Sequence, residues 1–255
     1  MNQSTGHRLP SFFITDPMPC PYIDGQMERK LFTHMAGDNA NDINNNLTHA
    51  GFRRSQTIAY RPACDTCNAC RSVRVDVARF SPSKNMKRIL SANNDLTATL
   101  LPAETSREQY ELLRSYLDSR HRDGGMSDMS SFDYMAMVEE TAVDTQICEY
   151  RDKDGALVAC LLRDRLQDGI SLVYSFFNPE MTGRSLGTFV ILDQIRQAGF
   201  GAGFGAGLEA DIGADTLTQP YVYLGYLIEN CSKMSYKKRF SPLQILGAEG
   251  WRDYE

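Results

Sequence analysis

Three cysteines stand at equal intervals before the middle of the chain. Cys64, Cys67 and Cys70 are each separated by two residues, and Cys20 lies upstream between two prolines. Thiolates at this spacing can converge on one metal ion, with a fourth from elsewhere completing a tetrahedral set. The run is equally typical of iron–sulfur loops, so the spacing predicts zinc or an iron–sulfur cluster without choosing between them. The alternative is a tight turn with small buried residues.

A second candidate site lies where a helix is expected to begin. Arg184-Ser-Leu-Gly187-Thr188 precedes an apolar helical pattern. A glycine-containing turn that leads into a helix presents backbone N–H groups to an anion. Arg184 and Gly187 are therefore candidate phosphate-binding residues, and an ordinary helix start is the alternative.

The elements that must position these residues follow a mixed order. Ser106 is a suitable N-cap for a helix that continues to Arg120, and a shorter helix is expected over 132–140. Around them, the pattern predicts strands over 96–101, 146–151, 157–165, 170–177 and 221–228, and a helix over 187–197. Asp-Gly turns separate the middle strands as hairpins. This order predicts an α+β fold with a mixed sheet rather than a doubly wound parallel one.

Length and composition set the broad class. A chain of 255 residues can form one large domain or two modest ones. Its net charge of −5 argues against a protein coated in basic surface. No apolar run approaches the ~18 residues of a membrane-spanning helix, and the start of the chain does not look like a secretory signal. We therefore expect a cytoplasmic protein with no membrane partner.

Several short segments, taken in order, carry a resemblance to a known family. They are Pro19-Cys20-Pro21-Tyr22, Gly51-Phe-Arg-Arg-Ser55, Tyr60-Arg-Pro-Ala-Cys64, Ser175-Phe-Phe-Asn-Pro179, Arg184-Ser-Leu-Gly-Thr188, Tyr223-Leu-Gly-Tyr226 and Lys233-Met-Ser-Tyr-Lys237. This series resembles the arginyl-tRNA–protein transferase family, and most closely its bacterial branch, the aspartate/glutamate leucyltransferases. The likeness covers roughly residues 12–246.

The resemblance implies a fold and an activity. It implies an N-terminal Cys-containing domain over 12–100 and a C-terminal domain over 101–246 that is similar to the GNAT acyltransferases. It also implies transfer of leucine from leucyl-tRNA to proteins with an N-terminal Asp or Glu, which marks them for degradation by the N-end rule pathway. No cofactor is needed for this reaction. The alternatives are an arginyl donor, or a metal-cluster nucleic-acid-binding protein without transferase activity.

Two features depart from the family pattern. Leu227 stands where relatives usually carry Trp, and the glycine-rich stretch 199–207, with the acidic residues that follow it, is longer than the usual link. These put one aromatic contact and the role of the insertion in doubt.

The implied reaction, aminolysis of an ester, needs a proton acceptor and donors to an oxyanion. Strand alternation over 223–229 predicts Tyr223 and Glu229 on one face and Tyr226 on the other. Glu229 is the candidate base, and Tyr223 and Tyr226 are candidate donors. The alternative is two core aromatics and a surface acid.

Both substrates also need cations. Lys233, Lys237 and Lys238 fall at helical spacing and are expected to contact the tRNA backbone, unless they form a solvated face. An acidic acceptor residue is best bound by arginine. Arg120 and His121 are candidates, and Arg53, Arg54 and Arg71 are others. The alternative for His121 is a capping residue at the end of a helix.

Overall fold

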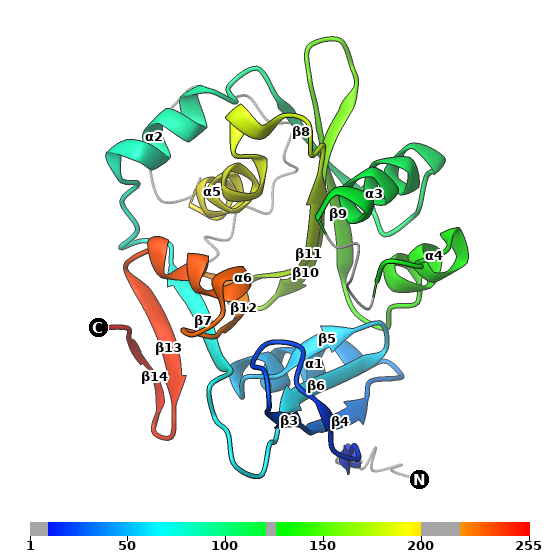
Figure 1. Ribbon diagram of the computed structural model, residues 1–255, viewed down its shortest axis with the longest axis vertical. Helices are drawn as coiled ribbons and strands as arrows, with labels where there is room; N and C mark the ends of the chain where they lie inside the picture. Colours follow the sequence, from blue (N-terminus) through cyan, green and yellow to red (C-terminus); the bar gives the residue numbers. More distant parts are fainter. Residues whose placement is uncertain (1–9, 121–125, 200–219) are drawn as a thin grey trace, which may run out of the picture.

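Eight strands of the protein form one mixed sheet, in the order β14-β13-β7-β12-β11-β10-β9-β8 (Figure 1). The computed structural model describes residues 10–120, 126–199 and 220–255. The strands of this sheet are β7 (Arg71–Asp76), β8 (Thr97–Pro102), β9 (Thr145–Arg151), β10 (Leu157–Leu166), β11 (Gly169–Phe177), β12 (Tyr221–Leu227), β13 (Leu243–Gly247) and β14 (Gly250–Asp253).

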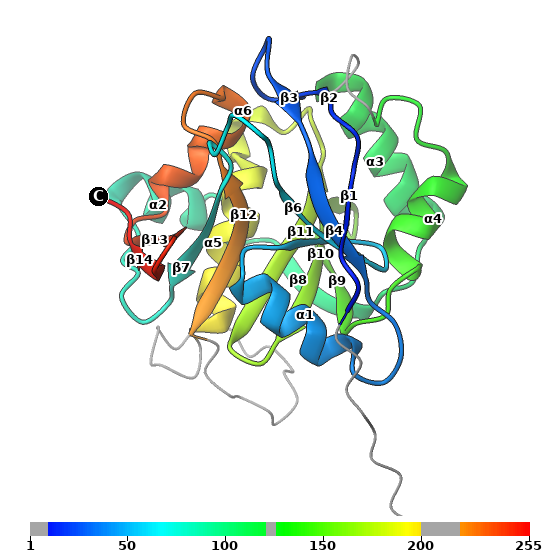
Figure 2. The same ribbon diagram turned by 90° about the horizontal axis from the view of Figure 1, so that it is seen from below.

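A smaller unit precedes this sheet in the chain. It holds a four-stranded sheet in the order β1-β4-β6-β5, a two-stranded β2–β3 hairpin and helix α1 (Ala40–His49). Its strands are β1 (Phe13–Ile14), β2 (Met18–Pro19), β3 (Met27–Glu28), β4 (Lys30–His34), β5 (Arg53–Ser55) and β6 (Ile58–Pro62). In Figure 2 this unit lies across one face of the large sheet, on the side away from helix α5 (Leu186–Ala198).

Helices cover both faces of the large sheet. Helix α5 and helix α2 (Lys84–Ser91) pack on one face, while α3 (Arg107–Arg120) and α4 (Ser131–Glu139) pack on the other. The alternation of a strand explains the two cores: in β10, Leu161 is buried with α5 and Leu162 with α3. Short helical turns follow β12, namely α6 (Ser232–Ser235) and η3 (Tyr236–Arg239), and η1 (Thr182–Arg184) precedes α5.

Strands β11 and β12 are paired at one end only. All strands from β8 to β11 run antiparallel, and β12 then lies parallel to β11 after the chain has passed through α5. The parallel register joins Gly169 to Tyr221 and Ser171 to Tyr223, and no pairing continues beyond it. On its other side β12 has a register shift between Tyr223 and Gly225, where Gly225 has φ +81°. This bulge lets the C-terminal ends of the two strands separate.

The predicted elements are largely confirmed. Helix α3 begins after Ser106, whose hydroxyl accepts from the Gln109 N–H (3.2 Å) while the Gln109 side chain accepts from the Ser106 N–H (3.0 Å). The α+β class with a mixed sheet is also as expected. The domain boundary at residue 100 stays a prediction, although β7 of the first segment lies inside the large sheet and β8 crosses the boundary.

No helix in the described ranges has the length and apolarity that crossing a bilayer requires.

Candidate functional site

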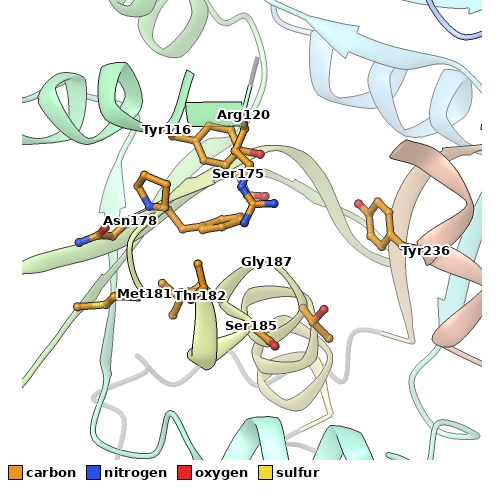
Figure 3. A pocket seen from close by; sticks show the side chains of 13 residues that line it. Tyr116, Arg120, Ser175, Asn178, Met181, Thr182, Ser185, Gly187 and Tyr236 are labelled. Atoms are coloured by element: carbon orange, nitrogen blue, oxygen red, sulfur yellow. The ribbon is translucent and has the colours of Figure 1, made fainter. Parts of the chain in front are cut away.

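A pocket of about 400 Å³ lies beside the C-terminal part of β11, beyond the last residue of β11 that pairs with β12. Helix α3 contributes Tyr116 and Arg120, β11 contributes Ser175 and Phe177, and the start of α5 contributes Gly187. Figure 3 shows Arg120 and Tyr116 on one side of the pocket, the first turn of α5 on another, and Tyr236 across from them. The pocket thus collects segments that are far apart in the sequence.

The first turn of α5 carries no negative side chain. Its N-cap Ser185 has φ +51°, makes no side-chain capping hydrogen bond, and no acidic residue occupies the first turn. Backbone N–H groups at such an end lack helical partners and carry a partial positive charge. Glycine at 187 is required sterically, because a Cβ there would lie 2.9 Å from the Phe177 ring. The predicted phosphate-binding role of Gly187 therefore has a matching location.

Two tyrosine hydroxyls and one cation complete the pocket. Burial raises the pKa of both Tyr116 and Tyr236, so both remain protonated and able to donate at neutral pH. Arg120 is exposed, with its guanidinium 5.8 Å from the centre of the Phe177 ring. It is the one charged side chain among the described residues that line the pocket. His121, its predicted companion, lies outside the described residues.

Arg184 is placed elsewhere. Its guanidinium donates to Asn93 Oδ1 (2.9 Å), to the Ala92 carbonyl (3.2 Å) and to Asp95. Arg184 therefore fastens the end of α2 to the turn before α5, and its side chain does not line the pocket.

Tyr223 lies at the paired end of β11 and β12, away from the pocket. Its hydroxyl donates to Asp168 Oδ2 (2.8 Å) and accepts from Arg74 (3.0 Å), and His49 Nε2 lies 2.9 Å from the same carboxylate oxygen. The Arg74 guanidinium stacks 3.5 Å from the centre of the Tyr221 ring. Burial raises the pKa of Tyr223, so this hydroxyl is held as a hydrogen-bond donor in a closed polar cluster.

The predicted face alternation over 223–229 is wrong. The side chains of Val222, Leu224 and Leu227 belong to the core under α5. The Tyr226 hydroxyl instead lies 3.0 Å from the carbonyl oxygen of Gly51 in the N-terminal unit. Since Tyr223 also faces that unit, both tyrosines share one face. The bulge at Gly225 is the physical reason, because one extra residue inverts the alternation that follows it.

Glu229 follows β12 at the surface. Its Oε1 accepts from the Tyr254 hydroxyl (2.7 Å), and Lys238 lies 3.7 Å from its Oε2. The hydrogen bond from Tyr254, with the Lys238 charge, lowers the pKa of this carboxylate. The structure does not bring Glu229 to the pocket.

The basic stripe is not a continuous surface. Lys233 and Lys238 are exposed, but Lys237 is only 5% exposed and donates to the Tyr226 carbonyl. Burial, and then the nearby charge of Arg53, lower the pKa of Lys237 to about 7. The expected tRNA contact of Lys237 is therefore corrected: the chain changes from α6 to η3 at Tyr236, which turns this lysine inward.

The four predicted metal ligands line a second cavity of about 280 Å³ between the β2–β3 hairpin and the loop after β6. Cys20, Cys64, Cys67 and Cys70 are all free thiols. Burial, and then the other three cysteines, raise the pKa of Cys70 to about 12. No three His, Cys, Asp or Glu side chains of the described ranges are close enough together to hold a metal ion as they stand. The structure thus brings the four thiols to one cavity without a formed ligand set.

Tyr116 and Tyr236 both line the pocket, and the sequence assigned a role to neither. Tyr236 stands only inside the resembling segment Lys233-Met-Ser-Tyr-Lys237, and no local pattern marks either tyrosine as facing a pocket formed by α3, β11 and α5.

Two family descriptions match this chain in succession. "Arginine-tRNA-protein transferase, N terminus" matches residues 18–88, and "Arginine-tRNA-protein transferase, C terminus" matches residues 108–247.

Curated relatives match over nearly their whole length. An aspartate/glutamate leucyltransferase of Parvibaculum lavamentivorans is 52% identical over 99% of this chain and 98% of its own. One of Mesorhizobium japonicum is 52% identical over 96% of this chain and 94% of its own. A solved structure, "The structure of L-PGS from Bacillus licheniformis", superposes with a TM-score of 0.46 and 15% identity over 72% of this chain and 58% of that one.

The residues that line the pocket, on α3, β11 and α5 and at Tyr236, all lie within the segment matched by the C-terminal family description. Together with the full-length relatives, the two family matches show that this chain belongs to the arginine-tRNA–protein transferase family and is an aminoacyltransferase.

Proposed function

We propose that this enzyme transfers leucine from leucyl-tRNA to the N-terminal Asp or Glu of target proteins, which marks them for degradation by the N-end rule pathway. The relatives named for this reaction match the chain almost end to end. The observation that carries the proposal is the pocket at the α5 N-terminus, where a phosphate, an aminoacyl ester and an incoming amine can meet. The reaction belongs in the cytoplasm, where charged tRNA is found.

The 3′ end of the donor tRNA occupies this pocket. The unpaired N–H groups at the start of α5 and the exposed Arg120 receive the last phosphates. The leucyl side chain packs against apolar residues such as Phe177 and Met181. An arginyl side chain would find no carboxylate among the described lining residues and would meet the like charge of Arg120, which favours leucine over arginine.

The chemical step is attack of the acceptor amine on the aminoacyl carbonyl. A free α-amine has a pKa near 8, so a sizeable fraction is already neutral at physiological pH. The Tyr236 hydroxyl, kept protonated by its raised pKa, is placed to donate a hydrogen bond to the developing oxyanion. As the amide bond forms, the bond from the carbonyl carbon to the ribose oxygen breaks, and the proton lost by the amine ends on that ribose oxygen. No cofactor or covalent intermediate is required. The roles predicted for Glu229, Tyr223 and Tyr226 stay predictions, and none of these three residues lines the pocket.

The tRNA body lies along the exposed lysines next to the pocket. Lys233 and Lys238 are both exposed, and they flank Tyr236, which lines it. Replacing both by Gln should weaken leucyl-tRNA binding and flatten its dependence on salt, because fewer counterions are released. An unchanged salt slope would argue against this contact.

The four-cysteine cavity is proposed to bind zinc or an iron–sulfur cluster. Its support is the convergence of Cys20, Cys64, Cys67 and Cys70 on one cavity of about 280 Å³. Four thiolates suit either metal. Elemental analysis and an absorption spectrum of anaerobically purified protein distinguish the two. Protein that carries neither metal, and gains none on reconstitution, would refute the proposal.

The decisive experiment for the activity uses labelled leucyl-tRNA and arginyl-tRNA with peptides that begin with Asp, Glu, Lys or Ala. Leucine found only on the Asp and Glu peptides is the expected result. Arginine transfer would change the donor and keep the family. The absence of transfer from either tRNA would refute the proposed function.

A further inference from the structure

Arg53 reaches from the N-terminal unit into the gap between β11 and β12. One of its terminal nitrogens donates to Ser171 Oγ (3.1 Å), and the other donates to the Leu172 carbonyl. These groups lie on β11 at the point where pairing with β12 ends. On the opposite side, a Cβ at Gly225 of β12 would lie 3.2 Å from the guanidinium. Arg53 therefore occupies the base of the separation that opens into the pocket.

This guanidinium has no carboxylate partner in the described part of the chain. Its hydrogen bonds to Ser171 and Leu172 are both to neutral oxygens. The next residue differs: Arg54 forms a two-point ion pair with Asp164 at 2.6 and 2.7 Å. A half-buried arginine without a counter-charge is unusual, because burial of a charge is normally offset by a paired group.

A second cation near Arg53 is also without an acidic partner. Lys237 is almost fully buried, and its ammonium donates to the Tyr226 carbonyl. Burial, and then the positive charge of Arg53, lower the pKa of Lys237, and the same charge opposes the burial that raises the pKa of Tyr236. Tyr236 lines the pocket. Arg53, and Lys237 in its protonated form, are thus held near Tyr236 of the pocket, and no described acidic residue pairs with either of them.

We propose that Arg53 binds the side-chain carboxylate of the acceptor's N-terminal Asp or Glu, with Lys237 adding positive charge beside it. This inference rests on the proposed function. Arginine suits a carboxylate because its planar donors can bind both oxygens, and Arg53 keeps three of its five N–H donors without a partner among the described residues. The acceptor would then approach from the side of the N-terminal unit while the donor tRNA enters from the side of α5. Arg120 would then bind the phosphates of the donor tRNA and not the acceptor.

The test is acceptor selectivity of Arg53→Gln. Leucine transfer from one leucyl-tRNA is measured on peptides that begin with Asp, Glu, Asn or Gln, and leucyl-tRNA affinity is measured separately. We expect kcat/KM for the Asp and Glu peptides to fall about 100-fold, which is about 2.7 kcal/mol, while the Asn and Gln values and the tRNA affinity stay within threefold. Arg107→Gln, which removes one charge from a fully exposed side chain, is the matched control.

The outcome is decided by two ratios of kcat/KM: that of the Asp peptide to the Asn peptide, and that of the Glu peptide to the Gln peptide. Unchanged ratios in Arg53→Gln would overturn the inference, and so would an equal loss on all four peptides with weakened tRNA binding, because Arg53 would then serve a tRNA phosphate. Collapse of the ratios in Arg120→Gln, with Arg53→Gln unaffected, would assign the carboxylate to Arg120 instead.

A second variant covers the case in which Arg53→Gln does not fold. Arg53→Lys keeps the charge but loses the planar fork, so the ratios should fall to intermediate values. Retention of wild-type ratios in Arg53→Lys would count against the inference. Failure of the proposed function itself would appear separately, as an absence of leucine transfer by the wild-type enzyme.

Discussion

Strands β11 and β12 are paired at one end and separated at the other, and the two ends treat polar groups differently. At the paired end, one carboxylate oxygen of Asp168 accepts a hydrogen bond from Tyr223. The side chains of His49 and Arg74 lie close to the same oxygen. At the separated end, Arg53, Lys237 and the start of α5 present positive charge with no anion of the described chain to meet it. The first end brings an acid and its cations together, although Asp168 Oδ1 is buried without a hydrogen-bond partner among the described residues. The second end holds cations for which the described chain supplies no acidic partner.

The same contrast is visible in two neighbouring residues of β5. Arg54 is fully buried and paired with Asp164, whose strand position lies opposite Ser171 of β11. Arg53 contacts that same Ser171 from the gap and has no acidic partner among the residues that the structure describes. One arginine joins the N-terminal unit to the large sheet, and the other extends from that joint toward the pocket.

The largest effect on stability is expected from removing the Arg54–Asp164 ion pair, which joins the N-terminal unit to the large sheet. Arg54→Ala leaves Asp164, 1% exposed, without its counter-charge, so the free energy of unfolding should fall by about 3–5 kcal/mol. Urea unfolding measures this. Arg79→Ala is the control, because the Arg79–Asp253 pair is about half exposed and its loss should leave the urea midpoint nearly unchanged. If both variants lost a similarly small amount of unfolding free energy, the buried Arg54–Asp164 pair would contribute no more to stability than the surface pair.

The next prediction concerns the pocket at the separated end, which a larger side chain at position 187 would partly fill. Gly187→Val places carbon atoms against the Phe177 ring and pushes that ring into the pocket. We expect kcat/KM for leucyl-tRNA to fall roughly 100-fold, or about 2.7 kcal/mol, with a small change in melting temperature. Gly183→Val, four residues earlier where a Cβ meets open space, is the control. Equal activity in the two valine variants would show that the pocket does not hold the donor.

Lys237 predicts a pH dependence of stability. Its pKa is about 7 in the folded chain and about 10.4 when unfolded, so the unfolded chain binds more protons between these values. Stability from this group is therefore lowest below pH 7 and rises as the pH increases. Relative to Lys237→Met, the wild type should gain roughly 2 kcal/mol between pH 7 and pH 9. If the free energy of unfolding of the two proteins depended on pH in the same way, the pKa of Lys237 would not be lowered by its surroundings.

The paired end should give the smallest change. Tyr223→Phe removes one hydrogen bond to the Asp168 carboxylate and should lower the free energy of unfolding by about 1.5 kcal/mol. Thermal unfolding and leucine transfer are measured together. Loss of transfer far beyond what this destabilisation explains would return Tyr223 to a catalytic role and would blur the difference between the two ends.

Local signals in the sequence located most of the elements. Ser106 caps α3 as predicted, the Asp-Gly turns lie at the ends of the predicted hairpin strands, and the start of α5 was placed to within one residue. These features depend on neighbours within a few residues, which a sequence displays directly. Gly187 was found for the same reason, because a glycine at a helix start is a local pattern.

Two of the errors, on the strand faces of Tyr223 and Tyr226 and on Lys237, share one cause. The faces of Tyr223 and Tyr226 were assigned from an uninterrupted strand, but the Gly225 bulge reverses the alternation. Lys237 was assigned to a surface stripe from an uninterrupted helix, but the change at Tyr236 turns it inward. A period of two or of 3.6 residues predicts a face only while the element stays regular, and these irregularities are stabilised by contacts with distant segments.

By itself, the sequence determined the order of elements, the mixed α+β class, the family and the glycine in the first turn of α5. Only the tertiary structure decided which cations have an acidic partner within the described chain and which do not. Arg53 and Arg54 are chemically identical and adjacent, and alternation puts them on opposite sides of one short strand. Asp164 and Ser171 come from strands more than a hundred residues away. The charge balance of a site depends on such distant partners, so it is set when the chain folds.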